Sequence, residues 1–171
     1  MTAASAHAPR PIRSMAATII LCAVASLVFA LPLRIAGLQL PEPVFALVPA
    51  FAWAAIRPSI LPPFALLALG VFLDLLWGAP LGLWPLSLMA AYGFTFSMRP
   101  SLSGQSFIAL WAWYAAACTV AFVTGMVLTS ILTGAVPSLI GVALQWLVSA
   151  ALFPLANRLM ERQTEADLRF R

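Results

Sequence analysis

Long apolar stretches make up most of this chain, separated only by short breaks at charged residues or at clusters of Pro and Gly. A helix needs about 20 apolar residues to cross the hydrocarbon core of a bilayer, and most of the stretches approach that length. They cover residues 15–33, 41–56, 59–77, 81–98, 106–133 and 136–157. The pattern therefore predicts an all-α membrane protein: one polytopic domain over 1–171, a single bundle of about six transmembrane helices with a cytoplasmic tail at 158–171.

Two of the predicted spans depart from the usual length. The stretch at 41–56 has only 16 residues, begins with Pro41 and Pro43, and contains Pro49. We expect a kinked helix there that packs against protein rather than lipid. The stretch at 106–133 has 28 residues, so it must tilt or extend beyond the bilayer.

Composition agrees with lipid as the surrounding solvent. Hydrophobic residues make up 63% of the chain and charged residues only 8%, which is more apolar surface than a small soluble domain can bury. The formal net charge of +4 comes from arginines that stand one or two at a time between apolar runs. A nucleic-acid surface needs clustered arginines, so we expect membrane lipid and no nucleic acid as a partner.

The arginines also predict the orientation of the bundle. With the N-terminus in the cytoplasm, eight of the nine arginines are cytoplasmic and only Arg34 lies outside. Six spans then place both ends in the cytoplasm, in a multi-pass inner-membrane protein. A signal peptide cleaved after Ala30 is the alternative for the first span, because Arg10 and Arg13 precede an apolar core. An uncleaved anchor is favoured because the apolar run continues to Leu33.

Candidates for catalysis or metal binding are scarce. The single His, His7, lies in the N-terminal tail, and no Ser or Thr of a span has a His or Lys base within the membrane. Cys22 and Cys118 lie in apolar stretches without metal-ligand spacing, so we interpret them as small buried hydrophobic residues. We expect a protein that is not an enzyme, with no catalytic residue, no metal site and no cofactor.

Asp74 is the one ionisable side chain well inside an apolar stretch, where an unpaired carboxylate is unfavourable. The favoured interpretation is structural. The next helix begins near Leu81, and its unpaired backbone N–H groups and positive dipole end can receive the carboxylate. Gly78 and Gly82 allow the tight turn that this contact needs. An ion or ligand site formed with Arg34 is the functional alternative.

Small residues mark faces for helix packing. Gly70 lies one turn before Asp74 on the same face, where it allows another helix to approach closely. The fifth span carries a small residue at every fourth position: Ala117, Ala121, Gly125, Thr129 and Thr133. This ridge is expected to face either its own bundle or another membrane protein. Gln145, in the middle of the sixth span, is expected to form a hydrogen bond across helices.

The turn at Asp74 reads Asp74-Leu75-Leu76-Trp77-Gly78-Ala79-Pro80-Leu81-Gly82. It resembles the hallmark of the MreD family of bacterial rod shape-determining proteins, which is Asp-Leu-Leu-x-Gly-x-x-Leu-Gly after an apolar helix. The layout is also similar: the chain has a similar length, its second apolar segment ends in Arg57-Pro58, and its last helix runs into a short basic tail.

The resemblance implies a non-enzymatic membrane scaffold of the cell-elongation machinery. It implies a bitopic partner, MreC, and through MreC a link from MreB filaments to the glycan polymerase RodA and its transpeptidase, which maintains rod shape during peptidoglycan synthesis. The family is also similar in fold to the six-helix substrate-binding subunits of energy-coupling-factor (ECF) vitamin transporters. A small-molecule-binding membrane subunit is therefore the alternative, and an ion pathway through Asp74 is a third hypothesis.

Overall fold

Helices form nearly all of the part of the chain that the computed structural model describes. The described residues are 10–30, 34–35, 38–39, 42–56 and 60–168. In chain order the elements are α1 (Arg10–Ala30), β1 (Arg34–Ile35), β2 (Leu38–Gln39), α2 (Leu47–Ile56), α3 (Leu61–Trp77), α4 (Leu83–Ser97), α5 (Arg99–Leu102), α6 (Phe107–Thr133), α7 (Leu139–Ala150) and α8 (Phe153–Leu168). The predicted all-helical fold is confirmed, apart from the unpredicted antiparallel pair of two-residue strands, β1 and β2.

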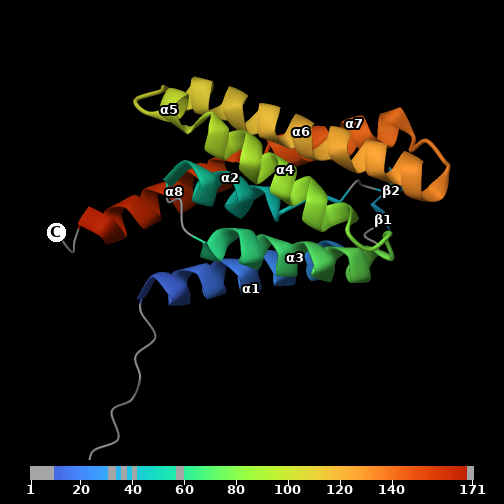
Figure 1. Cartoon of the computed structure of the whole chain (residues 1–171), viewed down its shortest axis with the longest axis horizontal. Coiled ribbons are helices and arrows are strands. Elements are labelled where there is room, and N and C mark those ends of the chain that lie inside the picture. Colours follow the sequence, from blue (N-terminus) through green and yellow to red (C-terminus); the bar gives the residue numbers. More distant parts are fainter. Residues whose placement is uncertain (1–9, 31–33, 36–37, 40–41, 57–59, 169–171) are drawn as a thin grey trace, which may run out of the picture.

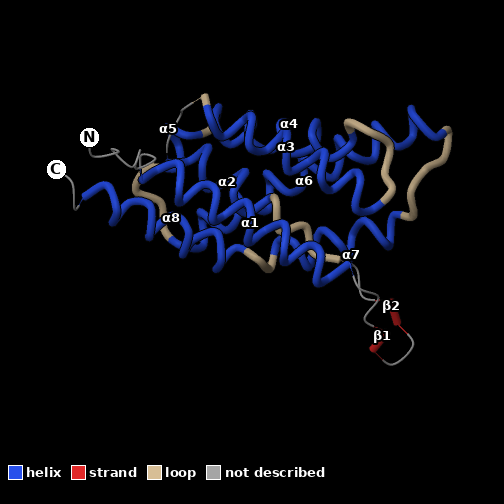
Figure 2. Tube along the Cα trace, turned by 90° about the horizontal axis from the view of Figure 1, so that it is seen from below, coloured by secondary structure: helices blue, strands red, loops and turns tan. Residues whose placement is uncertain are grey.

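The long helices follow one axis and alternate in direction from α1 to α7, and α8 continues in the direction of α7 (Figure 1). Helix α1 lies beside α3, α2 beside α8, and α4 beside α6, and α7 returns along α6. The α3–α4 turn, the α6–α7 turn and the two strands lie at one end of the molecule, which we call the β1–β2 end. Helix α5 and the end of α8 lie at the opposite end (Figures 1 and 2).

Helix α2 is the buried centre of the bundle. Every residue from Leu47 to Ala54 is buried, which is typical of a helix that is apolar on all sides. The helix begins only at Leu47, so the span predicted at 41–56 starts too early. Pro49 therefore falls in the first helical turn, where an N–H group would have no helical partner, and the reason to expect a kink disappears.

Helices α3 and α4 form a close antiparallel pair. Pro62 lies in the first turn of α3, where proline is well tolerated. A Cβ atom added at Gly70 would lie 2.5 Å from the backbone nitrogen of Pro85 and 2.6 Å from its Cα. Only a residue without a side chain fits there, so Gly70 determines how closely α4 packs on α3.

The last predicted span, at 136–157, consists of two helices. Helix α7 ends at Ala150 and α8 follows after a short turn, because Pro154 has no N–H group for the helical hydrogen bond to the Ala150 carbonyl. The indole Nε1 of Trp111 donates to that carbonyl at 3.0 Å. A side chain of α6 thus replaces the backbone hydrogen bond that the proline removes.

The other predicted spans each contain a helix with shifted ends. Helix α1 begins before the span predicted at 15–33, α5 is an additional short helix, and α8 extends through much of the predicted tail. The first span is predicted to end at residue 33, and the alternative cleavage would fall directly after Ala30. Residues 31–33 lie outside the described residues. By length and composition, two helical stretches of the described chain could cross a membrane, Phe107–Thr133 and Leu139–Glu161.

Replacing Gly70 with Ala is expected to destabilise the bundle by about 1–3 kcal/mol, because the added methyl group would overlap the backbone of Pro85. Gly93→Ala is the matched control, since Gly93 also lies within a helix and a Cβ atom there meets nothing within 4 Å. That variant should gain up to about 1 kcal/mol from the better helix propensity of Ala. Thermal unfolding in detergent, followed by circular dichroism, measures both. Equal stability of the two variants would contradict the close packing at Gly70.

Candidate functional site

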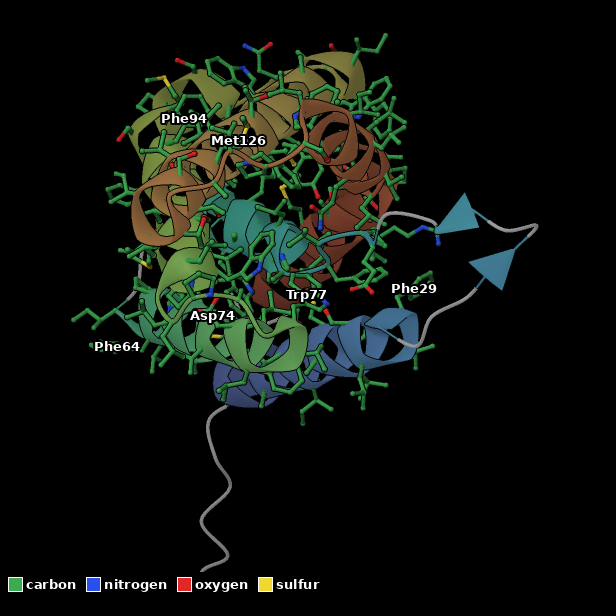
Figure 3. The ribbon with its side chains drawn as sticks, turned by 90° about the vertical axis from the view of Figure 1, so that its right-hand side faces the viewer. Phe29, Phe64, Asp74, Trp77, Phe94 and Met126 are labelled. Carbon is green, nitrogen blue, oxygen red and sulfur yellow. The ribbon has the colours of Figure 1, made fainter. Side chains whose placement is uncertain are left out.

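Asp74 lies in the last turn of α3, near the β1–β2 end, with only 1% of its surface exposed (Figure 3). Both of its carboxylate oxygens accept hydrogen bonds from the start of α4. The Gly82 N–H donates to Oδ2 at 2.7 Å, and the Trp84 N–H donates to Oδ1 at 2.9 Å. The first N–H groups of a helix have no partner within it, so Asp74 caps α4 from the preceding helix.

The turn from Asp74 to Gly82 has the backbone shape that this contact requires. Gly78 has a φ of 61° and Gly82 a φ of 97°, values that residues with a side chain adopt only with strain. The Asp74 carbonyl accepts from the N–H groups of Gly78 and Ala79, which closes the end of α3. Leu81, in contrast, is exposed and takes no part in the buried contact.

The chemistry of the Asp74 site is that of a helix cap. A carboxylate is stabilised at the positive N-terminal end of a helix, and hydrogen bonds to a charged group are stronger than neutral ones. Within the described residues, no group of three or more His, Cys, Asp or Glu side chains could hold a metal ion. The Arg34 side chain, the other member of the hypothetical ion site, lies outside the described residues.

Aromatic side chains connect this turn to the rest of the bundle. The rings of Trp77 and Trp84 meet edge to face with centroids 5.0 Å apart. Trp84 also meets Phe122 of α6 edge to face at 6.3 Å. In Figure 3, Trp77 lies on the side of α3 that faces the middle of the bundle. These contacts add specific aromatic packing to the burial of the rings.

The small residues of α6 mainly face the bundle itself. Ala117 and Ala121 are buried, and a Cβ atom at Gly125 would lie 3.3 Å from the Ser87 Oγ of α4. Only toward the end of α6 does the ridge become more accessible, with Thr129 partly exposed. Most of the ridge is therefore a contact between α6 and α4 and is not free for another protein.

Two polar residues of α7 hold the segment before α2. The Gln145 Nε2 donates to the Glu42 carbonyl at 3.1 Å, and the Ser149 Oγ accepts from the Val44 N–H at 3.0 Å. The Tyr114 hydroxyl of α6 donates to the Ser149 carbonyl at 3.2 Å. Gln145 thus bonds to the chain just before a helix rather than to a helix. The role of Ser149 has only a weak sequence signal, a small polar residue one turn after Gln145.

Glu42 lies beside Trp77 before the start of α2, outside the helices. Burial raises the pKa of the Glu42 carboxyl, and the nearby indole of Trp77 lowers this pKa by a smaller amount. The two groups do not reach full hydrogen-bond geometry, so the Trp77 N–H is buried without a partner. The sequence does not single out Glu42, because an acid beside a proline-rich turn is also typical of an exposed loop.

Arg99 closes the opposite end of α2. Its Nε donates to the Ala55 carbonyl at 3.1 Å, and its Nη2 donates to the Ile56 carbonyl at 2.9 Å. A cation that bonds the last carbonyl groups of a helix also interacts favourably with the helix dipole. In the predicted topology Arg99 is one of the cytoplasmic arginines, and no local sequence pattern shows that it caps α2.

A scan of family models and searches of curated proteins and of solved structures find no match to this chain. Functional inference therefore rests on the residues themselves. The most complete constellation is the one from Asp74 to Gly82, where one carboxylate and two glycines join α3 to α4.

Asp74→Asn is expected to lower the free energy of unfolding by about 1–3 kcal/mol. The Asn amide keeps one acceptor oxygen, but it points an NH₂ group at a second N–H donor and removes the charge at the start of α4. Glu161→Gln removes a charge from an exposed side chain and should change stability by less than about 0.5 kcal/mol. Unfolding of both variants in the same detergent gives the comparison. If the two are equally stable, the carboxylate does not hold α4 in place.

Proposed function

We propose that this chain is a non-enzymatic scaffold of the bacterial inner membrane that serves cell elongation in the manner of MreD proteins. In this proposal it crosses the membrane six times with both ends in the cytoplasm. It binds a bitopic partner like MreC and through it couples MreB filaments to RodA and its transpeptidase. The proposal rests on the turn from Asp74 to Gly82, whose sequence resembles the family hallmark.

The observation that carries the proposal is that the polar and glycine positions of this hallmark are all used to hold two helices together. Both Asp74 oxygens are bonded to backbone N–H groups, and Gly78 and Gly82 supply the positive φ angles of the turn. A carboxylate in this state is suited to fix a helix pair and is poorly suited to carry an ion or a substrate. A fixed helix pair is what a scaffold must present to its partners.

The outer surface of the bundle supports a position in lipid. Large apolar side chains point outward from α1, α3, α6 and α7: Leu21, Val24, Phe64, Val71, Val127, Ile131, Leu144 and Leu147 are all exposed. Soluble monomers rarely expose apolar patches of more than a few hundred Å². Lipid is the solvent that stabilises such a surface on several sides of a small bundle.

The alternative is a small-molecule-binding subunit of an ECF-type transporter. One observation favours it, a cavity at the β1–β2 end lined in part by Glu42, Trp77, Ser138 and Gln145. A vitamin site needs several polar groups that converge on the ligand. Glu42 is the one charged residue among the described lining residues. The cavity is compatible with a small ligand, and the scaffold is preferred because of the turn from Asp74 to Gly82.

Affinity purification of the tagged full chain from mild detergent separates these two functions. The scaffold predicts that a single-span protein like MreC co-purifies in a fixed ratio, and that depletion of the chain makes rod-shaped cells round. The untagged chain, expressed at the same level, controls for non-specific recovery. If an ATPase-linked transporter module is recovered in place of a single-span protein, the scaffold function is wrong.

Asp74→Asn also separates the scaffold from an ion pathway. Both carboxylate oxygens are bonded to backbone N–H groups. The Asn variant should therefore lose recovery of the partner only in proportion to its loss of folded protein. Proteoliposomes that contain the wild type should show no ion flux that depends on Asp74. Flux through the wild type, absent in an Asn variant that still folds and still binds its partner, would favour the ion pathway instead.

A further inference from the structure

A cavity of about 390 Å³ opens at the β1–β2 end, between the segment before α2, the end of α3 and the start of α7. Figure 3 views the molecule from this end. Polar side chains of Glu42, Trp77, Ser138 and Gln145 contribute to its lining, whereas Asp74 does not. The volume lies within the roughly 300–1,000 Å³ range of small-molecule pockets.

Glu42 gives this cavity a negative charge. Among the described residues that line the cavity none is cationic, so none of them supplies a counter-charge to this carboxylate. Its burial removes part of the hydration that stabilises a carboxylate in water. A positive group that enters the cavity would therefore gain more from Glu42 than it would from an exposed carboxylate.

Trp77 adds a second recognition group to the cavity. The face of an indole ring attracts cations, and the attraction is stronger when the cation is partly desolvated. The Trp77 ring is held in place by its edge-to-face contact with Trp84. Its N–H group is buried and directed to the Glu42 carboxyl rather than to the open cavity, so the ring and not the N–H group is available to a ligand.

Other ligand classes fit this lining poorly. A Ca²⁺ ion needs six to eight oxygen ligands and Mg²⁺ a near-octahedral set, and no acidic cluster exists among the described residues. An anion would be repelled by the Glu42 carboxylate. An apolar solute would displace water from the Glu42 carboxylate without replacing its hydrogen bonds, which is unfavourable.

We propose that this cavity binds an alkylammonium group, with the positive charge held between the Glu42 carboxylate and the Trp77 ring. Two sources carry this chemistry, the headgroup of phosphatidylethanolamine and a free amine such as ethanolamine. The lipid source rests on the proposed membrane position, which places the β1–β2 end at the level of lipid headgroups. The chemistry of the cavity does not depend on it.

Native mass spectrometry of the purified full chain in detergent tests the proposal. Phosphatidylethanolamine and phosphatidylglycerol are added at equal concentrations, and the wild type is expected to retain the first about tenfold better. Excess free ethanolamine should displace the retained phosphatidylethanolamine, which shows that the two share the cavity. Retention without displacement assigns the site to the lipid, and ethanolamine binding without lipid retention assigns it to a soluble amine.

Glu42→Gln keeps the shape of the side chain and should lower retention of phosphatidylethanolamine about tenfold. The fold should survive this change, because Gln145 bonds to the backbone carbonyl of Glu42 and not to its carboxylate. Trp77→Leu should have a similar effect, whereas Trp77→Phe keeps a ring and should fall between. Glu161→Gln, which removes an exposed carboxylate of α8, is the matched control and should bind like the wild type.

Equal retention of the two lipids by the wild type, together with no binding of ethanolamine, would overturn the proposal. An unchanged preference in a folded Glu42→Gln variant would overturn it as well. These outcomes are distinct from failure of the scaffold function, which is read from the proteins that co-purify. A chain that binds the MreC-like partner but shows no ammonium preference refutes the cavity proposal alone.

Discussion

The hydrogen bonds between the Asp74 carboxylate and the first N–H groups of α4 are the contact on which the rest of the bundle depends. A carboxylate among apolar helices is unfavourable without a partner, and the start of a helix has N–H groups that the helix cannot satisfy. Each group therefore removes the cost of burying the other. Because the contact fixes the α3–α4 turn, it also fixes the antiparallel helix pair that meets at Gly70 and Pro85. Helices α2 and α6 both pack on α4, so the position of α4 also determines where these two helices lie.

Several other polar contacts of the bundle also satisfy backbone groups at helix ends or breaks. Arg99 bonds the last carbonyl groups of α2, Ser149 accepts the Val44 N–H before α2 begins, and Trp111 bonds the Ala150 carbonyl that Pro154 leaves without its helical partner. In an apolar environment an unsatisfied backbone group costs several kcal/mol. Side chains from distant parts of the sequence are therefore needed wherever a helix ends inside the bundle.

This distribution explains what the sequence could predict. Helical segments follow from apolar runs because a helix satisfies its own backbone, and the partner of Asp74 follows from a lone carboxylate placed one short glycine-containing turn before the next helix. The positions at which helices begin and end are harder to predict from the sequence. Pro49 and Pro154 are visible in the sequence, but whether a proline kinks a helix, begins one or separates two depends on which neighbouring groups can accept or donate. Arg99 and Ser149 act on residues 43 to 105 positions away, and no local pattern encodes such contacts.

Asp74 and Glu42 lie toward the same end of the bundle and differ in what their carboxylates do. The Asp74 oxygens are both bonded to backbone N–H groups, and the dipole of α4 balances the charge. Glu42 takes part in the fold through its backbone carbonyl, which Gln145 binds, while its carboxyl lines a cavity in which no described residue is cationic. The fold therefore accounts for the charge of Asp74 but not for the charge of Glu42. The alkylammonium group proposed for this cavity is a positive group that would balance the partly buried charge of Glu42 beside Trp77.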